Sequence, residues 1–309
     1  MRVCVCACIE ARITIANRQS LALPPRSAVR GVRPARAAMV VVRGLKALLQ
    51  RTAPSKLVRS RTGTCYRLKG PGGKGTGPRL VGVAKKLSQT VWTGEDGASA
   101  SASAASASGG ADRAGKAWRG PGGGLRRGAA VDAQVTRCAR MSAAKRGAAR
   151  MLALTRTVFS ALDFHALTPV DAQRCVADAR RGLGTAADLV CQRGGGAGVP
   201  AELVLVEIKC GYPGDRKKAA LARAMQAPLE RAKDCHLHRH FAQLSATLAL
   251  FEAERGTLKA LEAKGVARVG AAVLYVDDTQ SVLFELPAWW RKRGEALLAR
   301  ITRAGRRGD

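Results

Sequence analysis

Positive charge is concentrated in the first half of this 309-residue chain, which limits where a compact domain can form. Residues 1–148 hold 28 basic and 5 acidic residues, whereas residues 149–309 hold 25 basic and 17 acidic residues. Because like charges oppose collapse, the first half is a poor candidate for a compact fold. The second half is long enough to bury an ordinary core. The net charge of +31 favours a polyanionic partner, and nucleic acid is the commonest.

Composition divides the chain into three regions. Residues 1–96 are basic and nearly free of acids, which predicts a disordered or targeting region. An organelle transit peptide, a plain basic tail, and sequence upstream of a later start such as Met39 all agree with this composition. Residues 97–140 are rich in Gly, Ala and Ser, which predicts a flexible linker. We therefore expect the folded domain over residues 141–309.

Two classes of protein are disfavoured by simple patterns. No apolar run approaches the roughly 18–20 residues that cross a bilayer, so we expect no membrane partner. The nine cysteines have no regular spacing, which argues against a secreted, disulfide-stapled domain. We expect a reducing compartment inside the cell, and the basic first region points to the nucleus or an organelle.

Hydrophobic periodicity predicts a mixed α/β domain in the second half of the chain. Helical and strand patterns alternate there, which is typical of a sheet covered by helices. The helices are expected over residues 143–165, 228–255 and 288–304, and the strands over residues 185–192, 202–210, 266–276 and 281–286.

A charged pair stands at the end of the strand over residues 202–210. Because side chains alternate along a strand, Glu207 and Lys209 project from one face, while the other face is apolar. Burying such a pair is costly unless the two groups pair or bind something. Asp188 can lie beside Glu207 if its strand and this one form a hairpin. Two such carboxylates suit Mg²⁺ or Mn²⁺, and a nearby lysine can orient a metal-bound water and stabilise charge on a phosphate.

The pattern of Asp188 followed by the tripeptide Glu207-Ile208-Lys209 resembles the motif of the PD-(D/E)XK nuclease superfamily. The resemblance is closest to the RecB-like and lambda-exonuclease-like branch. The resemblance covers about residues 149–290. It implies a restriction-endonuclease-like mixed sheet flanked by helices. It also implies a Mg²⁺-dependent deoxyribonuclease, an exonuclease of DNA recombination, repair or replication. Asp188, Glu207 and the backbone carbonyl of Ile208 would bind the metal, and Lys209 would position the nucleophilic water.

The same resemblance gives roles to residues on two helices. Gln243 matches a glutamine that completes the site in this branch. An acid on the first helix is also expected there, usually glutamate, but no glutamate lies between Glu95 and Glu202. Asp163 is the nearest substitute. Ala187 stands where proline is common, which is tolerable because proline is not a ligand.

The helix carrying Gln243 has a polar stripe. At about 100° per residue, His236, His240 and Gln243 fall on one line beside an apolar stripe. The stripe either walls the active site or faces solvent. His240 would then contact a phosphate and not Mg²⁺, because imidazole suits softer metals. A zinc site is disfavoured, because Cys235 and His238 lie on other faces of the helix and the sequence has no second ligand pair of C-x-x-C spacing.

Basic residues complete the expected site. Arg216, Lys217 and Lys218 follow the Glu207 strand in a loop, where they either contact DNA phosphates or are simply solvated. The rival function is a non-catalytic basic DNA-binding protein with a degenerate nuclease fold. The two functions differ in their need for a divalent metal, because plain phosphate binding requires none and weakens with salt.

Overall fold

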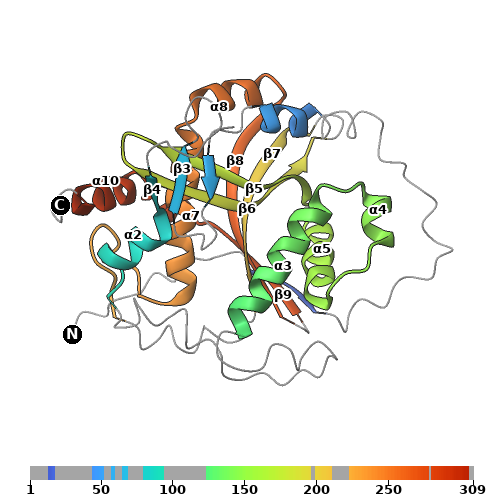
Figure 1. Ribbon diagram of the computed structural model, residues 1–309, viewed down its shortest axis with the longest axis horizontal. Helices are drawn as coiled ribbons and strands as arrows, with labels where there is room; N and C mark the ends of the chain where they lie inside the picture. Colours follow the sequence, from blue (N-terminus) through green and yellow to red (C-terminus); the bar gives the residue numbers. More distant parts are fainter. Residues whose placement is uncertain are drawn as a thin grey trace, which may run out of the picture.

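A computed structural model describes most of the second half of the chain and several segments of the first. The described residues are 13–17, 44–51, 57–59, 65–68, 79–93, 123–195, 199–210, 223–277 and 280–305. They form an α/β fold in which a mixed sheet lies between helices (Figure 1). The strands are β1 (Ile13–Asn17), β2 (Leu57–Arg59), β3 (Cys65–Leu68), β4 (Arg79–Gly82), β5 (Thr168–Asp178), β6 (Leu183–Gly194), β7 (Ala201–Cys210), β8 (Val266–Val276) and β9 (Gln280–Glu285). The helices are residues 44–51, α2 (Val83–Thr90), α3 (Gly123–Ala139), α4 (Ala143–Ala148), α5 (Ala153–Phe164), α7 (His236–Glu252), α8 (Arg255–Glu262), α9 (Ala288–Arg291) and α10 (Gly294–Gly305).

The sheet mixes parallel and antiparallel pairs around β6 and β7. Within the described residues its order is β1-β9-β8-β7-β6-β4-β3-β2, and β5 pairs with β6 outside this path. β7 pairs antiparallel with β6 and parallel with β8. β6 in turn pairs antiparallel with β5 and parallel with β4. The expected mixed sheet flanked by helices is therefore confirmed, whereas its likeness to restriction endonucleases stays a prediction.

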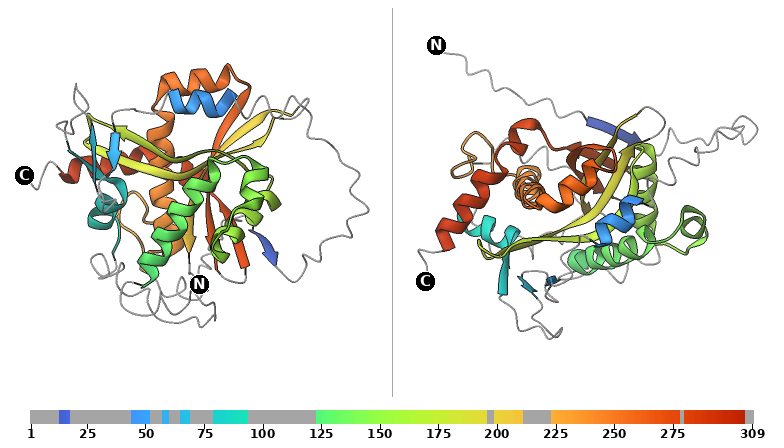
Figure 2. Two further views of the ribbon diagram at one scale, coloured as in Figure 1. Left: turned by 45° about the vertical axis from the view of Figure 1, so that its right-hand side comes forward. Right: turned by 90° about the horizontal axis from the view of Figure 1, so that it is seen from above.

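The alternation along β7 separates two layers of core. Leu203 and Leu205 are fully buried in the cluster that contains the apolar face of α7. Val204 and Val206 are buried on the other side, among residues of α3 and α5. Figure 2 (right) shows α7 and α3 on opposite sides of the strands. A strand that is apolar on both faces must be covered on both, so the two helical layers follow from the β7 sequence.

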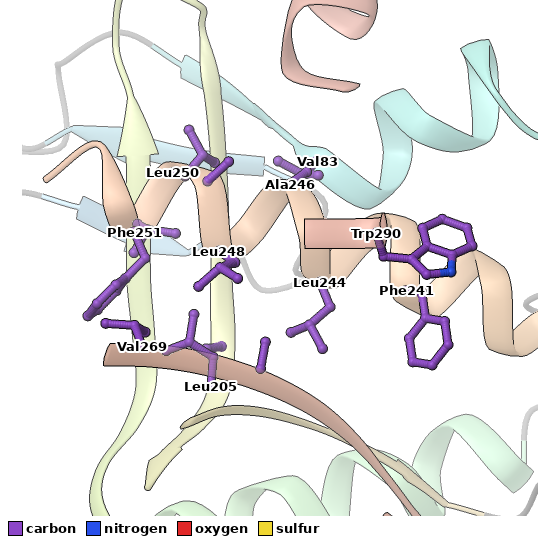
Figure 3. Packing of buried hydrophobic residues seen from close by; sticks show 14 of the residues in the cluster. Val83, Leu205, Phe241, Leu244, Ala246, Leu248, Leu250, Phe251, Val269 and Trp290 are labelled. Carbon is purple, nitrogen blue, oxygen red and sulfur yellow. The ribbon is translucent and has the colours of Figure 1, made fainter. Parts of the chain in front are cut away.

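Helix α7 packs on the sheet through residues spaced one helical turn apart. Leu244, Leu248 and Phe251 are each at most 1% exposed, and Figure 3 shows Phe251 beside Val269 and Leu248 beside Leu205. This spacing places the three side chains on one face of the helix. Because the apolar face is fixed against the sheet, the neighbouring polar stripe of α7 is held at the end of β7.

The strands of the second half match their predicted positions, whereas several helices differ. β6, β7 and β8 cover three of the strand patterns, and β9 covers all but the last residue of the fourth. The helix expected from residue 228 begins at His236, because residues 223–235 form turns. The helix expected over 143–165 is two helices, α4 and α5, and the last helix is divided into α9 and α10. β5 was not predicted.

The region boundaries also differ from those expected, because parts of the first half belong to the fold. Residues 123–139, within the expected linker, form α3, whose Val131 and Val135 are buried against α5 and the sheet. Leu45 and Leu49 of the 44–51 helix are fully buried in the α7 cluster. The buried Arg174 donates to the carbonyl of Leu49, which fixes this helix to β5. Within residues 1–122 the structure describes 13–17, 44–51, 57–59, 65–68 and 79–93.

Candidate active site

Three of the predicted residues meet at the end of β7. Nζ of Lys209 donates to Oε1 of Glu207 at 2.7 Å, and Nε2 of Gln243 on α7 donates to the same oxygen at 3.0 Å. The Glu207 side chain is 6% exposed and that of Lys209 is 22% exposed. Two donors therefore hold a buried carboxylate in one orientation, while the ammonium that pairs with it still reaches solvent.

Asp188 joins this group from β6. β6 and β7 form the expected hairpin, in which Leu189 pairs with Val206. The backbone N–H of Ile208 donates to Oδ2 of Asp188 at 2.8 Å. Burial, followed by the negative charge of Glu207, raises the pKa of Asp188 to about 8, against the opposing effects of Lys209 and the Ile208 hydrogen bond. The site thus concentrates negative charge in a partly desolvated place.

A third carboxylate, which sequence reasoning missed, comes from α3. Nε2 of Gln173 on β5 donates to Oδ1 of Asp132 at 2.7 Å and to Oδ1 of Asp188 at 3.3 Å. The charge of Asp132 also contributes to the raised pKa of Asp188. Asp132 is the only acid between Asp112 and Asp163, but it stands in a segment whose Gly and Ala content predicted a linker. Valines four residues apart at 131 and 135 were the signal of a helix.

The structure does not bring Asp163 to this site. It lies in the last turn of α5, partly exposed, where burial raises its pKa and the charge of Arg146 lowers it. Thr168, shortly after it, pairs with Gln192. Gln192 is four residues from Asp188, or about 13 Å along an extended strand. The acid that shares a donor with Asp188 is Asp132 of α3, and Asp163 of α5 has no such contact with Asp188 among the described residues.

The polar stripe of α7 faces the sheet rather than solvent. Nδ1 of His240 and the hydroxyl of Tyr275 on β8 share a hydrogen bond of 2.7 Å. Burial, followed by the positive charge of Lys209, keeps the pKa of His240 well below its usual value. The ring of His236 lies 6.5 Å from that of His240. His240 is thus a neutral neighbour of the Glu207–Lys209 pair.

Basic groups near the site come from α3. Arg216, Lys217 and Lys218 lie outside the described residues. Arg127, in the first turns of α3, exerts its charge on the thiol of Cys210 at the end of β7. Burial, followed by the charge of Asp188, nevertheless raises the pKa of that thiol to about 12. The charge of Arg127 therefore acts at the end of β7, next to the strand position of Lys209.

The donor groups suit a hard divalent cation. Asp188 and Glu207 offer carboxylate oxygens, and Ile208, which follows Glu207 in sequence, adds a backbone carbonyl. Among the described residues, no group of three or more His, Cys, Asp or Glu side chains is arranged to hold one ion. Mg²⁺ needs no such cage, since it is usually bound by one or two carboxylates and keeps several waters. The residues present therefore fit Mg²⁺ or Mn²⁺ better than zinc.

Comparisons with known proteins found no match, so the function of this site is inferred from its residues alone. No family model matches the chain, and neither a curated protein nor a solved structure does. In the part of the chain that the structure describes, no helix is both long and apolar enough to cross a membrane.

Proposed function

We propose that this protein is a Mg²⁺- or Mn²⁺-dependent deoxyribonuclease that hydrolyses DNA phosphodiester bonds as an exonuclease. The observation that carries the proposal is the meeting of Asp188, Glu207, Lys209 and Gln243 through hydrogen bonds of 2.7 to 3.0 Å and one β-hairpin. These are the four side chains that the PD-(D/E)XK resemblance selects. The resemblance also suggests a role in recombination, repair or replication.

Each of these residues has a defined task in phosphodiester hydrolysis. Asp188, Glu207 and the carbonyl of Ile208 would hold the ion, which would supply Lewis-acid chemistry on the phosphate and on a water. The N–H of Ile208 fixes the orientation of Asp188, and Gln243 fixes that of Glu207. The Lys209 ammonium, bound to Glu207, is the group that stabilises charge developing on the phosphate.

Charge on α3 supports DNA as the partner. Arg126, Arg137 and Arg140 are all exposed, and Arg126 and Arg137 are eleven residues apart, close to three full turns of helix. Arg126 and Arg137 therefore share one solvent face of α3, Arg140 follows the end of the helix, and Asp132 of α3 is joined to Asp188 through Gln173. A duplex or single strand lying along this face would keep its phosphates near the site.

The deciding experiment is cleavage of end-labelled linear DNA and covalently closed circular DNA, with Mg²⁺, with Mn²⁺ and with chelator. We expect metal-dependent loss of the linear substrate and survival of the circle. Lys209→Ala should reduce the cleavage rate by about a hundredfold or more while DNA binding persists, because the ammonium acts mainly on the transition state. Lys259→Ala is the matched control, because Lys259 is an exposed lysine of α8.

The outcomes separate the competing functions. Cutting of the circle would replace the exonuclease with an endonuclease. DNA binding without cleavage under any metal would favour the non-catalytic DNA-binding protein. Equal rates for wild type and a folded Lys209→Ala protein would remove Lys209 from the chemistry.

A further inference from the structure

Gln173 occupies an unusual place in β5. Its backbone has φ of 54°, although it is neither glycine nor part of a turn. Ala172 pairs with Leu189 and Arg174 pairs with Ala187, so Gln173 stands opposite Asp188 where the regular ladder is interrupted. A left-handed residue inside a strand is disfavoured for a side chain of this kind and persists where the surroundings require it.

The side chain of Gln173 links two layers of the molecule. Its Nε2 atom donates to Asp132 of α3 at 2.7 Å and to Asp188 of β6 at 3.3 Å. Both acceptors are carboxylates, and each raises the energy of the other when both are charged. The amide is a neutral donor that can bridge them without removing either charge, so both carboxylates keep lone pairs for a cation.

We propose that Gln173 is a positioning residue that holds Asp132 of α3 against Asp188 and so sets the metal affinity of the site. This inference rests on the proposed function, and it adds a role for β5 that neither the strand pattern nor the resemblance supplies. The backbone conformation that directs the Gln173 amide to both Asp132 and Asp188 interrupts the pairing of β5 with β6. A partner that orients a ligating carboxylate typically changes metal affinity by about tenfold to a hundredfold.

The test compares variants that separate the amide from the backbone. Gln173→Gly removes the amide and relieves the left-handed conformation, since glycine adopts positive φ freely. We expect its melting temperature to stay equal or rise. Its dissociation constant for Mn²⁺, measured by calorimetry without DNA, should rise at least tenfold. Gln173→Asn tolerates the same φ but is one methylene shorter, so it should weaken Mn²⁺ binding to a similar extent.

Two controls isolate the effect. Ala166, just after α5, also has φ of 54°, so Ala166→Gly should raise the melting temperature while leaving Mn²⁺ binding unchanged. Gln134 of α3 accepts from the N–H of Leu152 and donates to the carbonyl of Arg150, so Gln134→Ala should lower stability without changing Mn²⁺ affinity.

Hydrogen exchange in the metal-free protein gives a readout that does not depend on metal binding. The backbone amides of α3 should exchange faster in Gln173→Gly than in wild type, and not in Ala166→Gly. If the exchange of α3 were unchanged in Gln173→Gly, the role proposed for Gln173 would be overturned, whether or not wild type binds metal. If wild type bound no metal, that result would count against the proposed nuclease function. If wild type and Gln173→Gly bound Mn²⁺ with equal affinity, the role proposed for Gln173 would be overturned, while the proposed nuclease function would stand.

Discussion

Two groups of side chains reach the candidate site from opposite layers of the molecule. Glu207, Lys209 and Gln243, here called the α7 side, come from β7 and α7 and are joined directly by hydrogen bonds. Asp132, Gln173 and Asp188, here called the α3 side, come from α3, β5 and β6 and are joined through one amide. The α7 side is encoded by a short pattern, a charged pair at a strand end and a helical stripe. The α3 side depends on contacts between distant segments.

The comparison shows that the two sides carry different charges. The α7 side contains a paired ammonium, so its carboxylate has a built-in counter-ion. The α3 side brings Asp132 close to Asp188, and burial with the nearby carboxylates shifts the pKa of Asp188 upward. The proposed function therefore predicts that the α3 side gains most from a bound cation and that Lys209 of the α7 side acts on the substrate.

The largest expected effect comes from removing all residues before about residue 140, which include α3 and helices that pack on the α7 cluster. A chain that begins near residue 140 loses α3, α2 and the 44–51 helix, including the buried Leu45, Leu49, Val131 and Val135. Each such side chain contributes about 1.5–3 kcal/mol on burial, and the total is comparable with the net stability of a domain, about 5–15 kcal/mol. We expect this chain to be unfolded by circular dichroism, and a chain that begins near residue 40 to melt cooperatively.

A folded, cleaving product from the shorter chain would show that β6, β7 and α7 make a sufficient core. It would also confine the active site to the α7 side and Asp188. If the shorter chain folded but did not bind metal, residues of α3 would be required for metal binding.

Sequence patterns were sufficient wherever the defining contacts are local. Strands β6 and β7 and the stripe of Gln243 follow from alternation and helical spacing, which are properties of consecutive residues. Helix α3 was missed because Gly123, Gly124 and its alanines resemble the linker before it, and its stability comes from tertiary packing of two valines.

The partnership of Asp132 with Asp188 could not be predicted for a related reason. The two residues are far apart in the sequence and are joined by Gln173, whose backbone departs from the strand pattern around it. Asp163 is the acid nearest in sequence to the expected position, but nearness in sequence does not determine which helix covers the end of β7.

The next effect distinguishes the two candidate acids. Asp132→Asn keeps an oxygen that can accept from Gln173 but removes a negative charge from the α3 side. We expect the metal concentration for half-maximal cleavage to rise about tenfold or more. Asp163→Asn, measured in parallel, should leave this concentration unchanged. Equal behaviour of the two variants would separate Asp132 from the site.

A comparable effect tests the α7 side within one helix. Gln243→Ala removes a hydrogen bond to the Glu207 carboxylate and should lower the cleavage rate by about tenfold to a hundredfold. His240→Ala should cost less, because His240 contacts Tyr275 instead. Leu244→Ala, on the adjacent position, should cost about 2–5 kcal/mol of stability and little rate in the folded protein. An unchanged rate in Gln243→Ala would reduce the α7 side to the Glu207–Lys209 pair.

The smallest effect concerns the first turn of α7, where the helix acts as scaffold rather than site. His238 lies near the ring of Trp290, and its Nδ1–H donates to the carbonyl of Lys233. Burial lowers its pKa below the usual 6.5; the Lys233 hydrogen bond and Asp234 oppose this shift, and the charge of Lys233 adds to it. The unfolded chain therefore binds a proton more readily than the folded one. Stability should be complete above pH 6.5 and fall as the pH drops below that value.

The measurement is the melting temperature of wild type and His238→Phe between pH 7.5 and pH 5.5. The variant should lose part of the decrease seen in wild type, even if it is less stable at pH 7.5 for want of the hydrogen bond to Lys233. Lys233→Met, which removes a neighbouring positive charge, should reduce the decrease to a smaller extent. An identical pH dependence in wild type and His238→Phe would assign the acid sensitivity to other groups and leave the start of α7 without a titrating role.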